Sequence, residues 1–228
     1  MMVIKNPTVR KILKFLIPAL LIPLVIIIGV TLLKQKHYAL VASFVALLSL
    51  LLFVAGYEKK KTGSRRMVIV AVMITLSVVG RFIPLFKPVT ALTIITAVWL
   101  GGEAGFLVGA MSALISNFYF GQGPWTPFQM FAWGLIGLIA GLLSVPLKKH
   151  RLLMALYGLF SGMAYSFVMD IWTVLWYDKA FSAELYWAAL LTAVPYTILY
   201  SVSNVIFLWL LAKPFGEKLE RIKVKYGV

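Results

Sequence analysis

The chain has 228 residues, of which 62% are hydrophobic and 13% are charged, whereas a soluble domain is closer to half apolar and a quarter charged. This composition excludes a soluble globular protein and predicts an all-α, polytopic transmembrane helical bundle. The lack of cysteine excludes disulfides, thiolate nucleophiles and cysteine metal sites. The net charge of +15 comes mainly from short segments between apolar runs, so we expect topology signals and no binding of nucleic acid.

Residues 1–57 contain two apolar runs, which we expect to be two N-terminal transmembrane helices. The first run, Phe15–Leu33, is long enough to span and has no signal-peptide cleavage pattern after it, so we expect an uncleaved helix. A bend is expected near its prolines, Pro18 or Pro23. The second run is Tyr38–Gly56. We expect the basic stretch that follows, residues 58–66, to be a cytoplasmic loop.

Residues 67–212 are predicted to form a six-helix core, followed by a basic cytoplasmic tail, residues 213–228. The six apolar runs are Met67–Leu85, Pro88–Leu100, Phe106–Phe120, Pro127–Val145, Leu152–Tyr177 and Tyr186–Ala212, the last bent at Pro195. The run Pro88–Leu100 would extend roughly 20 Å, less than a hydrocarbon core of about 30 Å. We therefore expect one of its ends to stop inside the protein beside a cavity, with Phe82–Lys87 dipping inward as a lip.

The distribution of basic residues predicts the orientation of the bundle. Eight spans would place both termini on one side of the membrane. Most of the 22 Lys and Arg residues lie on that side, in the two chain ends, in residues 58–66 and in the turn at residues 148–151. The positive-inside rule therefore predicts a multi-pass protein of the cell membrane with both termini in the cytoplasm.

Small residues recur every four positions in the two runs that flank a polar and aromatic turn, Asn117–Gln129. They are Gly105, Gly109 and Ala113 before the turn, and Gly137 and Gly141 after it. In lipid, this spacing allows two helix backbones to approach closely. We therefore expect a tight helical hairpin whose turn forms an outward-facing mouth.

Four segments deliver amide, hydroxyl, charged and aromatic side chains to the same outer level. The candidate substrate-binding residues are Arg81, Lys87, Thr90, Asn117, Gln122, Trp125, Thr126, Gln129, Trp133, Asp170 and Trp172. Apolar walls with a few polar groups and flat aromatic faces are typical of a pocket for an organic solute. The tryptophans have an alternative interpretation as interfacial anchors. Asp170 has three possible interpretations: an ion pair with Arg81, a contact with substrate, or simple hydration.

Enzyme signatures are missing from the sequence. It has no HExxH pair, no P-loop and no paired intramembrane aspartates. Asp170 alone lies well inside a span, so no general acid–base pair is evident, and an ion-coupled carrier usually has several such groups. We expect a binding protein with no catalytic residues, no metal site and no permanently bound cofactor, which needs a partner to supply energy.

The segment from Met67 to the C-terminus resembles the substrate-binding (S) components of energy-coupling factor (ECF) transporters. The resemblance rests on Gly80-Arg81-Phe82, on Gly101–Gly109, on Ser116-Asn117-Phe118 and on the stretch GQGPWTP at residues 121–127. It implies a six-helix bundle that captures a vitamin or metal at the outer face. It also implies docking onto one transmembrane coupling protein and two ATPase subunits, followed by tipping in the membrane that brings the site to the cytoplasm.

The resemblance also suggests a docking face and a ligand. Where the family has an alanine-xxx-alanine pattern, this chain has Ala71 and Thr75. Within the family the chain most resembles the cobalamin-specific component, although the aromatic mouth would also suit riboflavin or another heteroaromatic vitamin. A metal ion is a poorer fit because the outer level lacks a cluster of His, Cys or Asp. The two N-terminal helices are additional to the six-helix pattern, and we expect them to pack beside the bundle.

Two other classes of function remain open. A membrane scaffold without a solute predicts a mouth that is filled by its own side chains. A carrier working alone predicts uptake without ATPase partners and sensitivity to Asp170→Asn.

Overall fold

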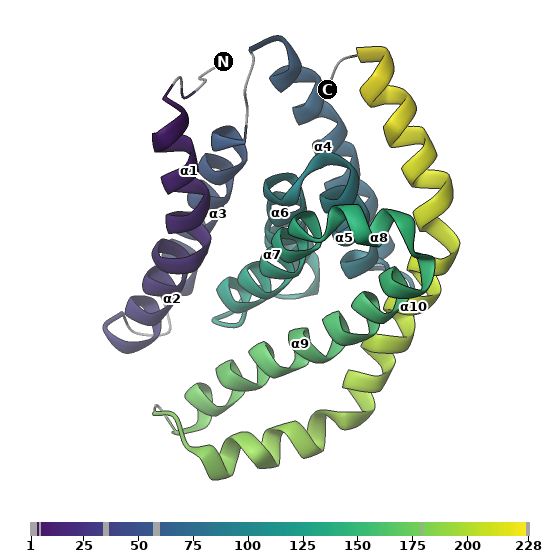
Figure 1. Ribbon diagram of the computed structural model, residues 1–228. Coiled ribbons are helices and arrows are strands. Elements are labelled where there is room, and N and C mark those ends of the chain that lie inside the picture. The colour runs from purple at the N-terminus through teal and green to yellow at the C-terminus, as the bar shows by residue number, and fades with distance from the viewer. Residues whose placement is uncertain (1–3, 5, 34–36, 57–59, 179, 227–228) are drawn as a thin grey trace.

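The computed structural model describes residue 4 and residues 6–33, 37–56, 60–178 and 180–226, and these residues form helices and no strand. Four helices are long and apolar enough to cross a membrane: Pro7–Thr31, Tyr38–Ala55, Arg151–Tyr177 and Ala183–Lys225. Two shorter helices, Val89–Leu100 and Thr126–Leu142, are also apolar. The predicted all-α transmembrane bundle is therefore confirmed. The start of the first helix and the end of the last lie at the same end of the molecule (Figure 1).

The N-terminal pair consists of one long interrupted helix and one regular helix. The first is built from α1 (Pro7–Leu16), the π-helical turn η1 (Ile17–Leu21) and α2 (Ile22–Thr31), and the second is α3 (Tyr38–Ala55). The π turn contains Pro18, which has no N–H to donate, so the irregularity falls at one of the two expected prolines. α3 packs against the core helices α6 and α7, as expected for helices that lie beside the bundle (Figure 1).

The core helices are α4 (Lys60–Gly80), α5 (Val89–Leu100), α6 (Gly102–Phe120), α7 (Thr126–Leu142), α8 (Ser144–Lys149), α9 (Arg151–Asp178) and α10 (Ala183–Tyr226). The short helix α5 is central, because it packs against α4, α6, α7 and α10. Each of its residues except Trp99 is buried. A helix that is apolar on all sides and surrounded by others forms the core of a bundle. α9 and α10 make a long hairpin on one side (Figure 1).

Glycine contacts confirm the tight hairpin formed by α6 and α7. A Cβ atom added to Gly109 would lie 2.5 Å from the carbonyl carbon of Trp133. A Cβ on Gly137 would lie 2.6 Å from the carbonyl carbon of Gly105. Because the obstacle in both cases is backbone, no side-chain rotation would relieve the clash. The small residues therefore set the distance between the two helices, as the spacing predicted.

Three expectations about segment ends are wrong. The basic stretch 58–66 is not a loop from end to end, since α4 begins at Lys60. The tail, residues 213–228, continues α10 to Tyr226 with Pro214 inside the helix. Lys, Arg and Glu are good helix formers, so a charged segment can extend a membrane helix into the headgroup region.

The third correction concerns Phe82–Lys87, which does not dip inward. Phe82 and Leu85 have 48% and 68% of their surfaces exposed. Instead, the Phe82 ring packs against Tyr119 and Phe120. The main chain of Lys87 is tied to α10, because Lys87 N donates to Ser203 Oγ over 2.9 Å and Ser203 Oγ donates to Lys87 O over 3.1 Å.

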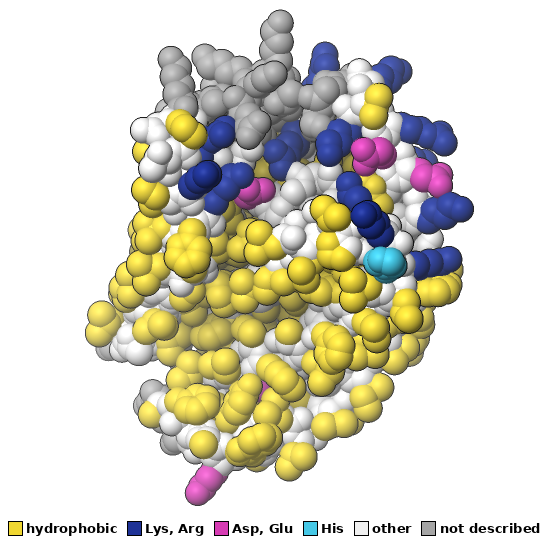
Figure 2. Space-filling view, viewed as in Figure 1, with side chains coloured by type: hydrophobic (Ala, Val, Ile, Leu, Met, Phe, Trp, Pro, Cys, Tyr) yellow, Lys and Arg dark blue, Asp and Glu magenta, His cyan; other side chains and the backbone are white. Residues whose placement is uncertain are grey.

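Charge is segregated along the bundle axis. The Lys and Arg side chains gather at the end that holds both termini, hydrophobic side chains predominate over the rest of the visible face, and an acidic side chain marks the opposite tip (Figure 2). This distribution is the one the positive-inside rule uses, and the cytoplasmic location of the termini stays a prediction. Of the basic residues used in that prediction, Lys5, Lys34, Lys36, Lys59 and Lys179 lie outside the described residues.

Candidate functional site

Asn117 is the centre of a buried polar cluster. Its side-chain nitrogen donates to Thr126 Oγ1 over 2.9 Å and to Gln129 Oε1 over 2.8 Å, and its side chain has no exposed surface. Asn117 lies in the last turn of α6, whereas Thr126 and Gln129 begin α7. The hairpin predicted from the glycine spacing therefore brings three of the candidate residues together.

Arg81 links this cluster to the end of α4. It follows the last residue of α4, and its guanidinium donates to Ser116 Oγ over 2.5 Å and to Asn117 Oδ1 over 2.6 Å. The guanidinium carbon also lies 4.8 Å from the ring centre of Phe120 and 5.4 Å from that of Trp133. A cation held over two aromatic faces and bonded to an amide is fixed in position.

An aromatic group borders the amides on the side of α9 and α10. Trp133 and Tyr165 are stacked, with ring centres 4.9 Å apart and an interplanar angle of 13°. Tyr200 meets Tyr165 edge to face at 5.3 Å. Gln129 Nε2 donates to Tyr165 Oη over 3.1 Å, so the amides and the aromatic rings form one connected site.

The turn between α6 and α7 is held by its own polar side chains. Gln122 Nε2 donates to Leu114 O over 2.8 Å, and Thr126 Oγ1 donates to Gln122 Oε1 over 3.0 Å. Trp125 meets Trp172 of α9 edge to face, with ring centres 5.7 Å apart. Gln122, Trp125 and Trp172 thus close the cluster at the α6–α7 turn, and Trp172 brings the last part of α9 against that turn.

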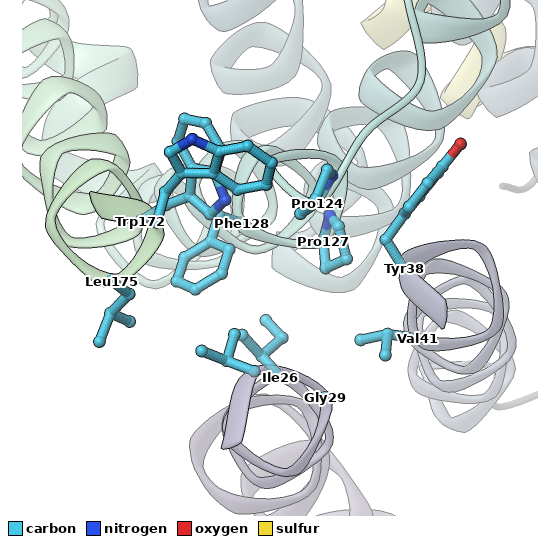
Figure 3. A pocket seen from close by; sticks show the side chains of 11 residues that line it. Ile26, Gly29, Tyr38, Val41, Pro124, Pro127, Phe128, Trp172 and Leu175 are labelled. Carbon is cyan, nitrogen blue, oxygen red and sulfur yellow. The ribbon is translucent and has the colours of Figure 1, made fainter. Parts of the chain in front are cut away.

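A small apolar cavity lies beside this closure, between the N-terminal pair and the core. Its volume is about 30 Å³, room for roughly one water molecule. Trp172 and Phe128 face it from the core, while Ile26, Gly29 and Val41 face it from α2 and α3 (Figure 3). This cavity is therefore far too small to hold an organic solute of vitamin size.

Three further candidates stand apart from the amides. Thr90 is buried on α5. Lys87 has its ammonium nitrogen 5.5 Å from the Phe120 ring centre, and partial burial together with the nearby Arg81 charge lowers the pKa of Lys87. Asp170 accepts a hydrogen bond from Ser166 Oγ at 3.5 Å. Arg81 is engaged with Ser116 and Asn117, so the ion pair considered for Asp170 is not formed.

Sequence reasoning missed Tyr165, Tyr200 and Ser116. The two tyrosines occur in the middle of apolar runs, although Tyr in membrane helices is enriched at the ends. A tyrosine hydroxyl at mid-span needs a hydrogen-bond partner, as Tyr165 finds in Gln129, and that requirement is the signal that could have identified Tyr165. Within the described residues, no three His, Cys, Asp or Glu side chains gather where they could hold a metal ion.

The predicted docking residues lie on the surface of α4. Ala71 and Thr75 are both exposed, and Thr75 Oγ1 donates to the Ala71 carbonyl over 3.0 Å. This bond satisfies the hydroxyl within its own helix, so Thr75 presents its methyl group and remains compatible with close helix contact.

One comparison with known proteins identifies the family of this all-helical chain. The family model described as ECF-type riboflavin transporter, S component, matches residues 61–219. The chain belongs to this family. It is therefore an S component, a membrane subunit that binds a vitamin and associates with an ECF module of coupling protein and ATPases. The match begins at the start of α4 and leaves out the N-terminal pair. No curated protein and no solved structure gave a significant match.

Proposed function

We propose that this S component captures riboflavin at the outer face of the cell membrane for ATP-driven uptake. The carrying observation is the stacked pair Trp133 and Tyr165, bordered by the amides of Asn117 and Gln129. Riboflavin has a planar tricyclic ring with carbonyl oxygens, ring nitrogens and one imide N–H. Flat aromatic faces suit such a ring, and amides supply both donors and acceptors for its edge.

The close packing of the site favours riboflavin over cobalamin. The amides are buried, and the nearby cavity of about 30 Å³ lies between the N-terminal pair and the core and would hold neither ligand, so side chains must move for either one. A flat ring requires the displacement of a few side chains along one plane. A corrin with its amide substituents would require a much wider separation of α7, α9 and α10. The description of the matching family, which names riboflavin, supports the same choice.

Ligand entry must open the closed cluster. Asn117 already uses both amide hydrogens within the protein, so a ligand has to exchange those bonds for its own. Such an exchange is nearly neutral when every lost bond is replaced, and unfavourable when one is not. We propose that the parts of α9 and α10 that carry Trp172 and Tyr200 move to admit the ring, because these two side chains close the site.

The same proposal assigns different roles to this subunit and to its partners. This subunit binds the vitamin and has no catalytic residue, and its partners hydrolyse ATP. With cytoplasmic termini, the cluster of Arg81, Asn117 and Trp133 would face the outside. The residues supply no covalent chemistry, and the ligand leaves unchanged.

The test is binding by the purified subunit in detergent without partners, measured by calorimetry with riboflavin and cobalamin in parallel. We expect one riboflavin per chain and no heat from cobalamin. Binding of cobalamin alone would overturn the choice of ligand and keep the S component. A folded protein that bound neither, nor any other vitamin tested, would favour the scaffold.

A further inference from the structure

An apolar groove runs between α4 and the end of α10, at the basic end of the bundle. Its volume is about 570 Å³. Val68, Val72 and Leu76 line it from α4, and Phe215, Leu219 and Ile222 line it from α10. Val68 and Val72 are more than half exposed. The end of α10 lies on the side of the bundle away from the N-terminal pair (Figure 1).

A basic recess of about 310 Å³ adjoins the groove. Arg66, Lys148 and Lys223 line it, with Trp99, Gly101 and Ser144. The groove and the recess lie at the same ends of the two helices, because Arg65 and Arg66 are successive on α4, and Ile222 and Lys223 are successive on α10. Two carboxylates border the recess, because Glu103 lies beside Gly101 and Arg66, and Glu220 is near Lys148, while Lys223 adds a further positive charge.

The basic side chains are held in place by their neighbours. Arg66 donates to the carbonyl of Leu100 and lies over the Phe53 ring. Lys148 lies over the Trp99 ring and is 3.6 Å from Glu220. Lys218 and Arg65 line the groove itself. The groove and the recess together form an opening that is apolar along the helices and cationic at its end. Such an opening is complementary to a lipid with an anionic headgroup.

We propose that this opening binds one anionic phospholipid, with its acyl chains in the groove and its phosphate in the recess. Hydrocarbon chains match the apolar walls, and basic pockets between membrane helices bind anionic headgroups. Lys218 and Lys223 supply headgroup contacts, while Arg65 and Arg66 border the headgroup from α4. The proposal does not depend on which vitamin the outer site binds.

The site also bears on docking. Val72 and Leu76 of the groove are adjacent in sequence to Ala71 and Thr75. A lipid bound there occupies part of α4 beside the expected contact with the coupling protein.

Native mass spectrometry of the purified full chain tests the proposal. The probes are dioleoyl phosphatidylglycerol and dioleoyl phosphatidylcholine, which have the same acyl chains and differ in headgroup charge. We expect phosphatidylglycerol to be retained preferentially at one copy per chain. The double variant Lys218→Ala/Lys223→Ala should lower that preference on the order of tenfold.

The matched control is Lys213→Ala/Arg221→Ala, which removes two positive charges from the same helix outside the groove and the recess. A second variant, Val72→Trp, fills the apolar part and should reduce retention of both lipids. Equal retention of the two lipids, or an equal effect of the two double variants, would overturn the proposal. Riboflavin titration of the same samples shows whether the outer site is intact in each variant. A change in lipid retention can then be distinguished from a change at the outer site.

Discussion

Trp133 of α7 and Tyr165 of α9 lie face to face, with ring centres 4.9 Å apart and planes 13° from parallel. The stack joins the glycine-spaced hairpin to the α9–α10 hairpin at the level of the buried amides. It is bonded to the amides through Gln129. This one contact therefore connects the close-packed α6–α7 hairpin to the α9–α10 hairpin, which we propose moves when a ligand enters.

Replacing Trp133 by leucine should weaken riboflavin binding roughly tenfold, because an aromatic stacking partner contributes about 0.5–1.5 kcal/mol beyond its area. Trp133→Phe, which keeps a flat face, should have a smaller effect. Quenching of riboflavin fluorescence measures both. Trp187→Leu is the control, since Trp187 lies on α10 with 67% of its surface exposed. Equal losses at positions 133 and 187 would argue against a stacking site.

Arg81→Ala should destabilise the bundle by about 1–3 kcal/mol, since the buried Asn117 Oδ1 would lose its donor. The measurement is the apparent midpoint of thermal unfolding in detergent. Lys87→Ala serves as the comparison, because Lys87 is tied to α10 through its main chain and the substitution preserves those bonds. If Lys87→Ala lowered the midpoint as much, the Arg81–Asn117 bond would not be the cause.

Gly137→Ala should separate α6 from α7 and cost about 1–3 kcal/mol, because the added methyl group meets the backbone of Gly105. Gly158→Ala is the matched control. There the nearest atom is Cδ1 of Leu208, the end of a flexible side chain that can turn away. The midpoint of thermal unfolding should be clearly lower for Gly137→Ala than for Gly158→Ala. The reverse order would contradict the close-packed hairpin.

Lys14→Ala should loosen the N-terminal pair at the basic end of the bundle. Lys14 Nζ lies 2.6 Å from Glu103 Oε1 and joins α1 to α6. The Lys14 side chain is partly exposed, so we expect at most about 1 kcal/mol, or roughly fivefold faster hydrogen exchange in α1. Lys11→Ala removes the same charge from the exposed side of α1. Identical exchange in the two variants would show that the ion pair contributes nothing.

Ala71→Trp and Thr75→Trp should prevent assembly with the ECF module while leaving riboflavin binding by the isolated subunit intact. Both residues are exposed on α4, and a bulky ring there blocks close helix contact. Co-purification with the coupling protein and ATPases measures assembly. Leu51→Trp, on an exposed position of α3, is the control. Unchanged assembly of both α4 variants would place the docking face elsewhere.

Hydropathy predicted the apolar middle of each membrane helix, because side chains in the hydrocarbon region have to be apolar. The helix ends depended on the helix propensity of charged residues, which hydropathy does not measure. The charged residues before Met67 and after Ala212 are good helix formers, so composition did not distinguish a loop from a helical extension. Glycine spacing predicted the α6–α7 hairpin, since both helices are adjacent in sequence. Tyr165 and Tyr200 reach the site only through the rotation of α9 and α10, which depends on tertiary packing.

The attachment of α1 to α6 through Lys14 and Glu103 enlarges the unit that would tip during transport. If the core rotates as one body, the N-terminal pair rotates with it, and Arg10, Lys11 and Lys14 move toward the hydrocarbon region. A basic side chain at the bilayer centre costs about 2.5–3.5 kcal/mol on insertion scales. The module must therefore shield these cations, or the ion pair must break so that the pair stays upright while the core turns. The N-terminal pair thus adds a free-energy cost to each transport cycle.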